Sequence, residues 1–510
     1  MVGMGDRFER RANDSLEKVP TRAAEECRPS EGGWREAFEG LLSRAPGPST
    51  EEVASFVARL ALSSGPRDLG GPELIDRLDA LERLKAAAAA EQARIQATFA
   101  ALCEAGMDPR AAALESKTGR DSARSRERSA SAQIALARKV SPARGAKLLS
   151  ASKRLVAELP CTLRALAGGQ LTEERAIFVA EGVEVLSPSA RAAVDEDLCG
   201  HPQRLEGLGD RGVQDAVRAA VDAIDDAAAT ARVRKAEEGR RVTVRRLPDA
   251  MAQLTAILPV AQAAAAAEAL RAAGRAAKAT GDPRTSGQVA ADTLVERVTG
   301  QAHADAVPLR VGLVMTESSL FRGAREPALL QGYGTIPAAQ ARTMVTHAAT
   351  APTSMPAGST AASSTRVLPA GAASLAGVWL RRLYLDPSTG ELAAMDSKLR
   401  RFPRAMAQFI EIRDQVCRTP YCEAPIRHID HIVPAASGGE TSAENGQGLC
   451  EACNHVKEST GWERAVVGTD PPDQTRPVGT RGDILTVTPT GHEYYSPPRR
   501  LPGSQKRRVG

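Results

Sequence analysis

Apolar residues recur at steps of three and four over long parts of the chain, which is the spacing of one face of an α-helix. The segment 71–106 shows this most clearly. It begins with Gly71-Pro72, and proline is well tolerated in the first turn of a helix. The pattern predicts one long helix with an apolar stripe made of Leu74, Leu78, Leu81, Ile95, Phe99 and Leu102.

Capping residues mark further helix starts downstream. Ser141 precedes Pro142, and Thr172 precedes two glutamates. A Ser or Thr side chain accepts a hydrogen bond from the free N–H groups of the first turn, and acidic residues favour the positive end of a helix. Short helices joined by tight turns are therefore predicted over residues 134–186. This arrangement is compatible with a helix-turn-helix and equally with an ordinary helical bundle.

Strict alternation of apolar and polar residues predicts strands in a few places. Residues 240–250 and 307–317 are expected to be strands, and residues 378–396 and 483–497 are expected to be hairpins. The longest uncharged stretch, 250–267, is mostly alanine. We expect a buried helix or helix pair there.

These elements predict a mainly α protein, with a large alanine-rich helical domain containing a small sheet and then a small metal-stabilised module. Composition sets the expected boundaries. Within the helical domain, residues 116–130 are expected to be a solvated basic linker, with a phosphate-facing patch as the alternative. The expected parts are a poorly ordered region 1–66, a helical domain 67–348, a flexible Ala/Ser/Thr/Pro linker 349–374, a hairpin plus the metal-stabilised module 375–495, and a basic disordered tail 496–510.

Composition supports helix over sheet and narrows the class of protein. Of the 510 residues 42% are hydrophobic but only 3% are aromatic, because alanine dominates. The net charge of +5 is too small to indicate nucleic-acid binding by itself. The N-terminus lacks the apolar core of a secretory signal, and no stretch is apolar enough to span a bilayer. We therefore expect a cytoplasmic protein without a membrane partner.

Half of the eight cysteines lie within one short segment. Four residues separate Cys417 from Cys422, 27 separate Cys422 from Cys450, and two separate Cys450 from Cys453. Two close cysteine pairs a few tens of residues apart suit tetrahedral zinc. Four thiolates leave no open coordination position, so the predicted zinc ion is structural and any catalysis needs other residues.

The segment between the cysteine pairs carries a second pattern. Asp430-His431 lies in a short apolar run, Gly438-Gly439 and Asn445 follow, and Cys450 begins a Cys-x-x-Cys-Asn-x-x-Lys sequence. The predicted order is strand, loop, strand, helix. Over residues 415–465 this pattern resembles the HNH endonuclease family, which has a ββα-metal fold.

The part of the chain upstream of the cysteines is also similar to a known domain. The segments "GYGTIPAAQAR" and "LYLDPSTGEL", together with "NGQGLCEACNHVKESTGW", resemble a multicopy family of actinobacteria. In that family a helical domain of unknown function precedes an HNH module. This resemblance supports the assignment of the whole chain but implies little about chemistry.

The resemblance implies roles for particular residues. His431 is expected to be the general base, since a neutral imidazole can take a proton from water near neutral pH. Asp430 and Asn454 are expected to bind a catalytic divalent metal ion, Mg²⁺ or Mn²⁺, and Asn445 is expected to orient His431. Many family members have His where this chain has Asn454, and His455 is the alternative ligand.

Nearby charged residues have two interpretations each. Lys457 and Arg427 are candidate phosphate contacts or plain surface charges. His428 could be a further ligand, a phosphate contact or a polar strand residue.

The sequence thus predicts a metal-dependent HNH endonuclease that hydrolyses DNA phosphodiester bonds. A non-catalytic nucleic-acid-binding protein with a degenerate module is the main alternative, and a zinc-stabilised interaction module is a third. DNA is the expected partner. A homodimer would suit the cutting of two strands, although no residue pattern indicates one.

Overall fold

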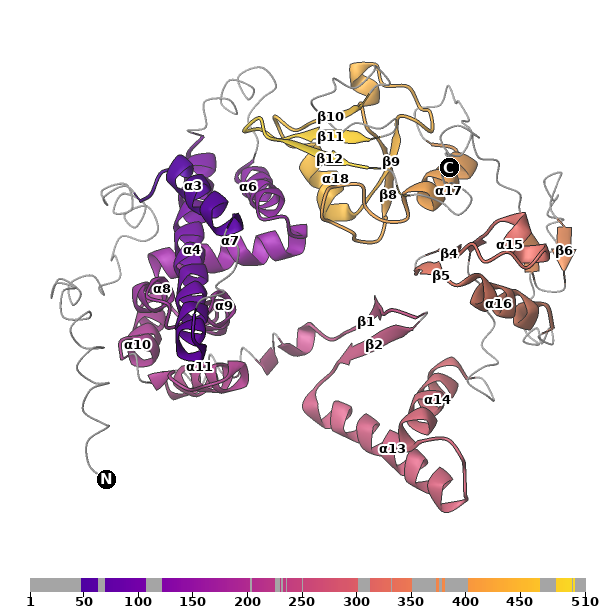
Figure 1. The fold of residues 1–510 in the computed structure, drawn as a ribbon, viewed down its shortest axis with the longest axis horizontal. Helices are drawn as coiled ribbons and strands as arrows, with labels where there is room; N and C mark the ends of the chain where they lie inside the picture. The colour runs from indigo at the N-terminus through magenta and orange to yellow at the C-terminus, as the bar shows by residue number, and fades with distance from the viewer. Residues whose placement is uncertain are drawn as a thin grey trace. The chain divides into compact units, whose positions relative to one another are not determined.

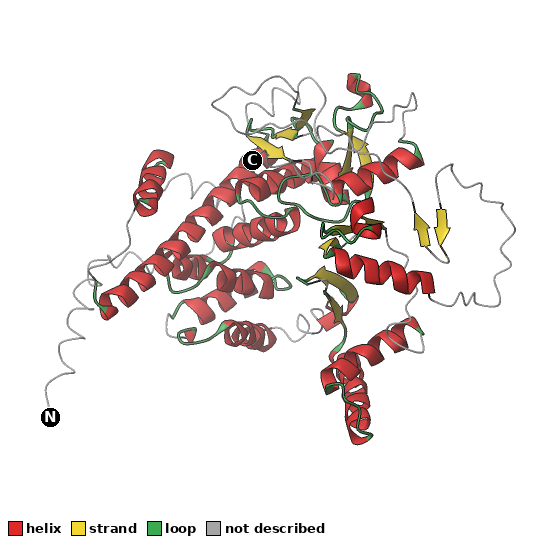
Figure 2. Ribbon diagram, turned by 45° about the vertical axis from the view of Figure 1, so that its right-hand side comes forward, coloured by secondary structure: helices red, strands yellow, loops and turns green. Residues whose placement is uncertain are grey.

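The computed structural model divides the chain into two compact units, residues 1–234 with 459–461 and residues 235–458 with 462–510. Figures 1 and 2 show the elements of each. Mainly helical structure with small antiparallel sheets confirms the predicted fold class. The structure describes residues 47–62, 69–106, 122–201, 204–224, 230, 233–234, 236–249, 251–300, 312–331, 333–350, 373–375, 378–380, 402–467, 483–497 and 499.

The first unit is a helical bundle. Ser141 and Thr172 cap the helices that follow them, as the sequence predicts. Its described helices are α3 (Thr50–Ala61), α4 (Gly71–Ala105), α6 (Ala123–Ala137), α7 (Pro142–Ala157), α8 (Pro160–Ala167), α9 (Glu173–Gly182), α10 (Pro188–Cys199) and α11 (Asp210–Ile224).

The buried face of α4 differs from the predicted leucine stripe. Leu78 is 59% exposed and Ile95 is 58% exposed, so that part of the prediction is wrong. The face that lies against α6, α7 and α8 is made largely of alanines, because a side chain that ends at Cβ lets helices approach closely. These alanines are Ala86, Ala89, Ala90, Ala93, Ala97, Ala100 and Ala101.

The linker expected over residues 116–130 is also wrong from residue 123 onward. Helix α6 begins there, Ser122 caps it by accepting a hydrogen bond from the Ser125 N–H at 3.2 Å, and Ala130 is fully buried. Ser125, Ser129 and Ala130 of α6 are buried, whereas Arg124 and Arg128 are exposed. The many charged residues of this segment therefore led the sequence analysis to predict a linker where an amphipathic helix forms.

The second unit begins with a two-stranded antiparallel hairpin and a pair of helices, α13 and α14, in contact with each other. The Tyr333 hydroxyl lies within hydrogen-bond distance of the carbonyls of Leu247 and Met251 in the turn of the hairpin. The elements up to residue 380 are β1 (Arg241–Arg246), β2 (Ala252–Ile257), α13 (Val260–Ala279), α14 (Ser286–Thr299), β3 (Leu313–Val314), α15 (Glu317–Phe321), β4 (Ala328–Leu330), β5 (Gly334–Ile336), α16 (Ala338–Thr350), β6 (Ala373–Leu375) and β7 (Val378–Leu380).

The buried helix expected over residues 250–267 is wrong in its first half. Residues 252–257 form β2, every residue of which is exposed, and the helix starts only at Val260. Pairing with β1 supplies the backbone hydrogen bonds that a helix would otherwise supply. Most of the predicted 349–374 linker, of the 378–396 hairpin and of the basic tail lies outside the described residues, and the ends of the linker belong to α16 and β6.

The rest of the second unit contains the cysteine segment. Strand β8 pairs with β9, and a separate sheet has the order β10-β11-β12, which confirms the hairpin predicted over 483–497. Among the described residues, no helix is both long enough and apolar enough to cross a membrane. The elements are α17 (Arg404–Asp414), β8 (His428–His431), the 3₁₀ helix η4 (Ala435–Ser437), β9 (Gly446–Leu449), α18 (Glu451–Lys457), β10 (Glu463–Val466), β11 (Ile484–Val487) and β12 (Glu493–Ser496).

Candidate metal centre and catalytic site

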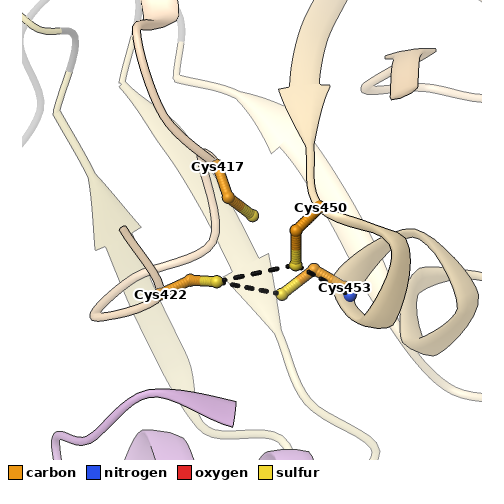
Figure 3. Close-up of side chains that lie close together, drawn as sticks. All are labelled: Cys417, Cys422, Cys450 and Cys453. Carbon is orange, nitrogen blue, oxygen red and sulfur yellow. Dashed lines mark hydrogen bonds between the residues drawn. The ribbon is translucent and has the colours of Figure 1, made fainter. Parts of the chain in front are cut away.

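The four clustered cysteines meet at one point (Figure 3). Their sulfur atoms all lie within 4.8 Å of one another, and all four residues are buried. The Cys422 sulfur is 3.6 Å from that of Cys450 and 3.7 Å from that of Cys453. A tetrahedral site with Zn–S bonds of about 2.3 Å places sulfurs about 3.8 Å apart. The cluster therefore fits a zinc ion with four thiolate ligands.

The four thiols of the cluster are coupled to one another. Hydrogen bonding to Cys417 raises the pKa of both Cys422 and Cys453, because a thiol that donates a hydrogen bond to a neighbouring sulfur is stabilised in its protonated form. Zinc binding requires deprotonated thiols and compensates their charge. Four thiolates this close together are compatible with a bound zinc ion.

Local hydrogen bonds bring the two cysteine pairs together. Cys450 is the N-cap of α18 and accepts from the Cys453 N–H at 3.5 Å. The fully buried carboxylate of Asp414, at the end of α17, accepts from the Gly448 N–H at 2.7 Å and from Arg418 at 3.3 Å. This carboxylate joins β9 to the turn of the first cysteine pair.

Antiparallel pairing of β8 with β9 places the Asp-His pair at the end of a strand. Asp430 lies opposite Gln447, and His431 lies opposite Gly446. A Cβ atom at Gly446 would come within 2.8 Å of the Phe402 ring, so only glycine leaves room for that ring. Strand pairing therefore positions both candidate catalytic residues and the aromatic ring beside them.

His431 is held on two sides. Its Nε2 lies 2.9 Å from the Thr441 hydroxyl, and its ring centroid lies 4.6 Å from that of Phe402. The residue is only 8% exposed, and this burial lowers the pKa of His431 below its ordinary value, while Asp430 opposes the shift. The imidazole is therefore neutral at neutral pH and keeps a lone pair for a proton.

Asp430 has a cationic partner that the sequence did not reveal. Lys457 forms an ion pair with the Asp430 carboxylate and donates to the His431 carbonyl at 2.9 Å. Gln447 donates to the same carbonyl at 3.1 Å. Because Lys457 is only 8% exposed and engaged inside the module, it does not lie at the surface as a phosphate contact would.

Asn445 joins the loop to the end of β8. Its side-chain oxygen accepts from the Val433 N–H at 2.8 Å, and its amide donates to the carbonyls of Val433 and Glu440 at 3.0 and 2.8 Å. Gly438 has φ +87°, a conformation that favours glycine, and a Cβ on Gly439 would collide with Asn445. The Gly-Gly pair and Asn445 thus shape one loop that returns to His431.

Asn454 has the one feature expected of a ligand for a hard cation. Its side-chain oxygen is buried and accepts no hydrogen bond within the described part of the chain. Buried carbonyl oxygens without a partner are rare, and Mg²⁺ or Mn²⁺ prefers oxygen ligands. The Asp430 carboxylate and the Asn454 carbonyl are both oxygen donors of the kind that such an ion prefers. The neighbouring His455 is exposed.

The other candidate residues lie at the surface. Arg427 and His428 are exposed, and neither joins the Asp430–His431 cluster. Sequence reasoning missed Thr441 and Phe402, which contact the His431 ring. Thr441 follows the Gly-Gly pair by two residues, which was the available signal, whereas nothing in the sequence marked Phe402.

The geometry defines the class of protein as one with a ββα module stabilised by a four-cysteine metal site. The HNH endonuclease family model matches residues 417–460, and the model described as "Domain of unknown function (DUF222)" matches residues 78–375. No curated protein and no solved structure matches the chain. Because the second match spans more than half of the 510 residues, the chain belongs to the DUF222 family, here with an HNH endonuclease module.

Proposed function

We propose that the protein is a metal-dependent endonuclease that hydrolyses DNA phosphodiester bonds, with His431 as the general base. The observation that carries the proposal is the burial of the His431 imidazole together with its lowered pKa. Its imidazole is buried beside Asp430, its pKa is lowered, and its Nδ1 makes no hydrogen bond with the described residues. A nucleic-acid-binding module without catalysis has no need of such a histidine.

Thr441 determines which ring nitrogen acts in this scheme. The His431 Nε2 atom lies 2.9 Å from the Thr441 hydroxyl. In the proposed tautomer the Nε2–H donates to that hydroxyl, which leaves the lone pair on Nδ1, 4.0 Å from Oδ1 of Asp430. Nδ1 takes the proton from the attacking water, and the resulting positive charge faces the Asp430 carboxylate. A divalent ion bound by Asp430 and Asn454 would stabilise the negative charge that develops on the phosphate.

The test is nicking of supercoiled plasmid DNA with Mg²⁺ or Mn²⁺. His431→Ala is expected to lower the rate at least 100-fold, since general bases contribute about 10²–10⁴-fold. His428→Ala is the matched control, because His428 lies on the same strand but is exposed, and it should cleave like the wild type. Equal rates for the wild type and His431→Ala would refute the proposal, as would a wild type that binds DNA but never cuts it.

One observation favours a second candidate, a non-catalytic nucleic-acid-binding protein. The ammonium of Lys457 already neutralises the Asp430 carboxylate that a catalytic ion would need. In that case Mn²⁺ should not bind at Asp430. Calorimetry with zinc-loaded wild type and Asp430→Asn distinguishes the two, because only the nuclease loses a Mn²⁺ site on substitution.

A further inference from the structure

The hairpin β1–β2 exposes all of its residues on both faces. Register pairs Thr243 with Thr255 and Arg245 with Gln253, so their side chains lie on one face. Arg241, two residues before Thr243, lies on the same face. We call this face the arginine ribbon, and it consists of Arg241, Thr243, Arg245, Gln253, Thr255 and, opposite Arg241, Ile257.

Within the described residues, the arginines of this face have no acidic partner. Arg241 donates to the Gly239 carbonyl at 3.1 Å, and within the described part of the chain neither Arg241 nor Arg245 forms an ion pair. The arginines of the helical bundle behave differently, since Arg144 pairs with Glu174 at 2.6 Å and Arg154 pairs with Glu184 at 3.2 Å. The arginine ribbon itself contains no acidic residue. It therefore attracts an anionic partner.

We propose that the arginine ribbon binds double-stranded DNA in its major groove. Two paired strands are about 5 Å apart, and with their side chains they fill a groove about 12 Å wide. Arginine, glutamine and threonine are the side chains that contact guanine, adenine and the thymine methyl group. The major groove of an RNA duplex is too deep and narrow for such a ribbon.

The opposite face of the hairpin is mainly apolar. Val242, Val244 and Leu254 lie there and are 63%, 69% and 49% exposed, and Arg246, at the end of β1, is the one charged residue that β1 and β2 place on that side. The ribbon proposal shares its ligand with the proposed nuclease function but does not depend on cleavage. Binding and cutting can therefore be measured separately.

The experiment measures the anisotropy of a labelled duplex of about 30 base pairs bound by full-length, zinc-loaded His431→Ala protein. The ribbon variant is Arg241→Gln with Arg245→Gln. The control is Arg271→Gln with Arg275→Gln on α13, which changes the net charge equally but removes two arginines already paired with Glu268. Far-UV circular dichroism verifies folding, and Arg245→Gln alone is used if the double variant fails to fold.

We expect the ribbon variant to weaken duplex binding at least tenfold and the control to change it less than twofold. The slope of log K against log salt should fall by about 0.9 for each lost phosphate contact. Binding by the ribbon variant that equals that of the control overturns the inference. A ribbon variant that keeps its DNA affinity but changes the sedimentation coefficient also overturns it, and assigns the face to a protein partner.

Cleavage by the same variants on the wild-type background separates the two proposals. A wild type that cuts plasmid DNA, with a ribbon variant that binds and cuts equally well, refutes only the ribbon. A wild type that binds through the ribbon but never cuts refutes only the nuclease.

Discussion

Replacing Lys457 by methionine tests the ion pair at the centre of the site. The side chain of Lys457 is 5% exposed and that of Asp430 is 28% exposed, so Lys457→Met leaves a carboxylate that water reaches only in part. Breaking a fully buried pair costs about 3–5 kcal/mol, and the partial exposure of Asp430 reduces this to about 2 kcal/mol. Methionine retains most of the apolar contacts of the lysine stem.

The lost hydrogen bond adds a smaller amount. The His431 carbonyl loses its Lys457 donor but keeps Gln447 at 3.1 Å, so this loss costs about 1 kcal/mol. The opening free energy of β8 and β9 should therefore fall by about 3 kcal/mol, which accelerates amide exchange by roughly 100-fold. Hydrogen–deuterium exchange of peptides covering residues 428–431 and 446–449 measures this directly.

A matched lysine provides the control. Lys153 pairs with Glu104 at 2.6 Å and with Glu127 at 3.0 Å, but its side chain is 24% exposed, so Lys153→Met should lower the free energy of unfolding by less than about 1 kcal/mol.

Millimolar Mn²⁺ should slow amide exchange more in Lys457→Met than in the wild type, since the ion replaces the ammonium at Asp430. Unchanged exchange in Lys457→Met without Mn²⁺ would refute the reasoning.

Three further predictions concern the same module. Burial lowers the pKa of His431 from 6.5, so the single-turnover cleavage rate should rise with pH and reach half its plateau below pH 6.5. A midpoint above pH 6.5 would contradict His431 as the general base. Removal of zinc by a chelator should abolish exchange protection over residues 417–460, and protection that persists without metal would exclude a structural ion. Thr441→Val should lower kcat about tenfold or more without changing DNA affinity, and Thr441→Ser, which keeps a hydroxyl, should restore kcat. Equal kcat values in the Val and Ser variants would show that the hydroxyl does not orient His431.

The metal cluster and the loop were predictable because their signals are local. Close cysteine pairs form tight turns that direct sulfurs to one side, and Gly438-Gly439 marks a turn whatever surrounds it. The alanine core of the bundle was not predictable in the same way. Periodicity shows that a helix has an apolar side, but the neighbours of α4 select the alanine face over that of Leu78.

The contacts around Asp430 and His431 belong to the tertiary structure. Lys457 is 27 residues from Asp430 in sequence, and Phe402 is 29 residues from His431. They meet only because the β8–β9 register and the four-cysteine site place α18 and the start of α17 beside the strand end. The sequence by itself determined which chemical groups are present and which short turns form. Only folding decided which groups meet, since the direction of a side chain across such separations depends on packing rather than on spacing.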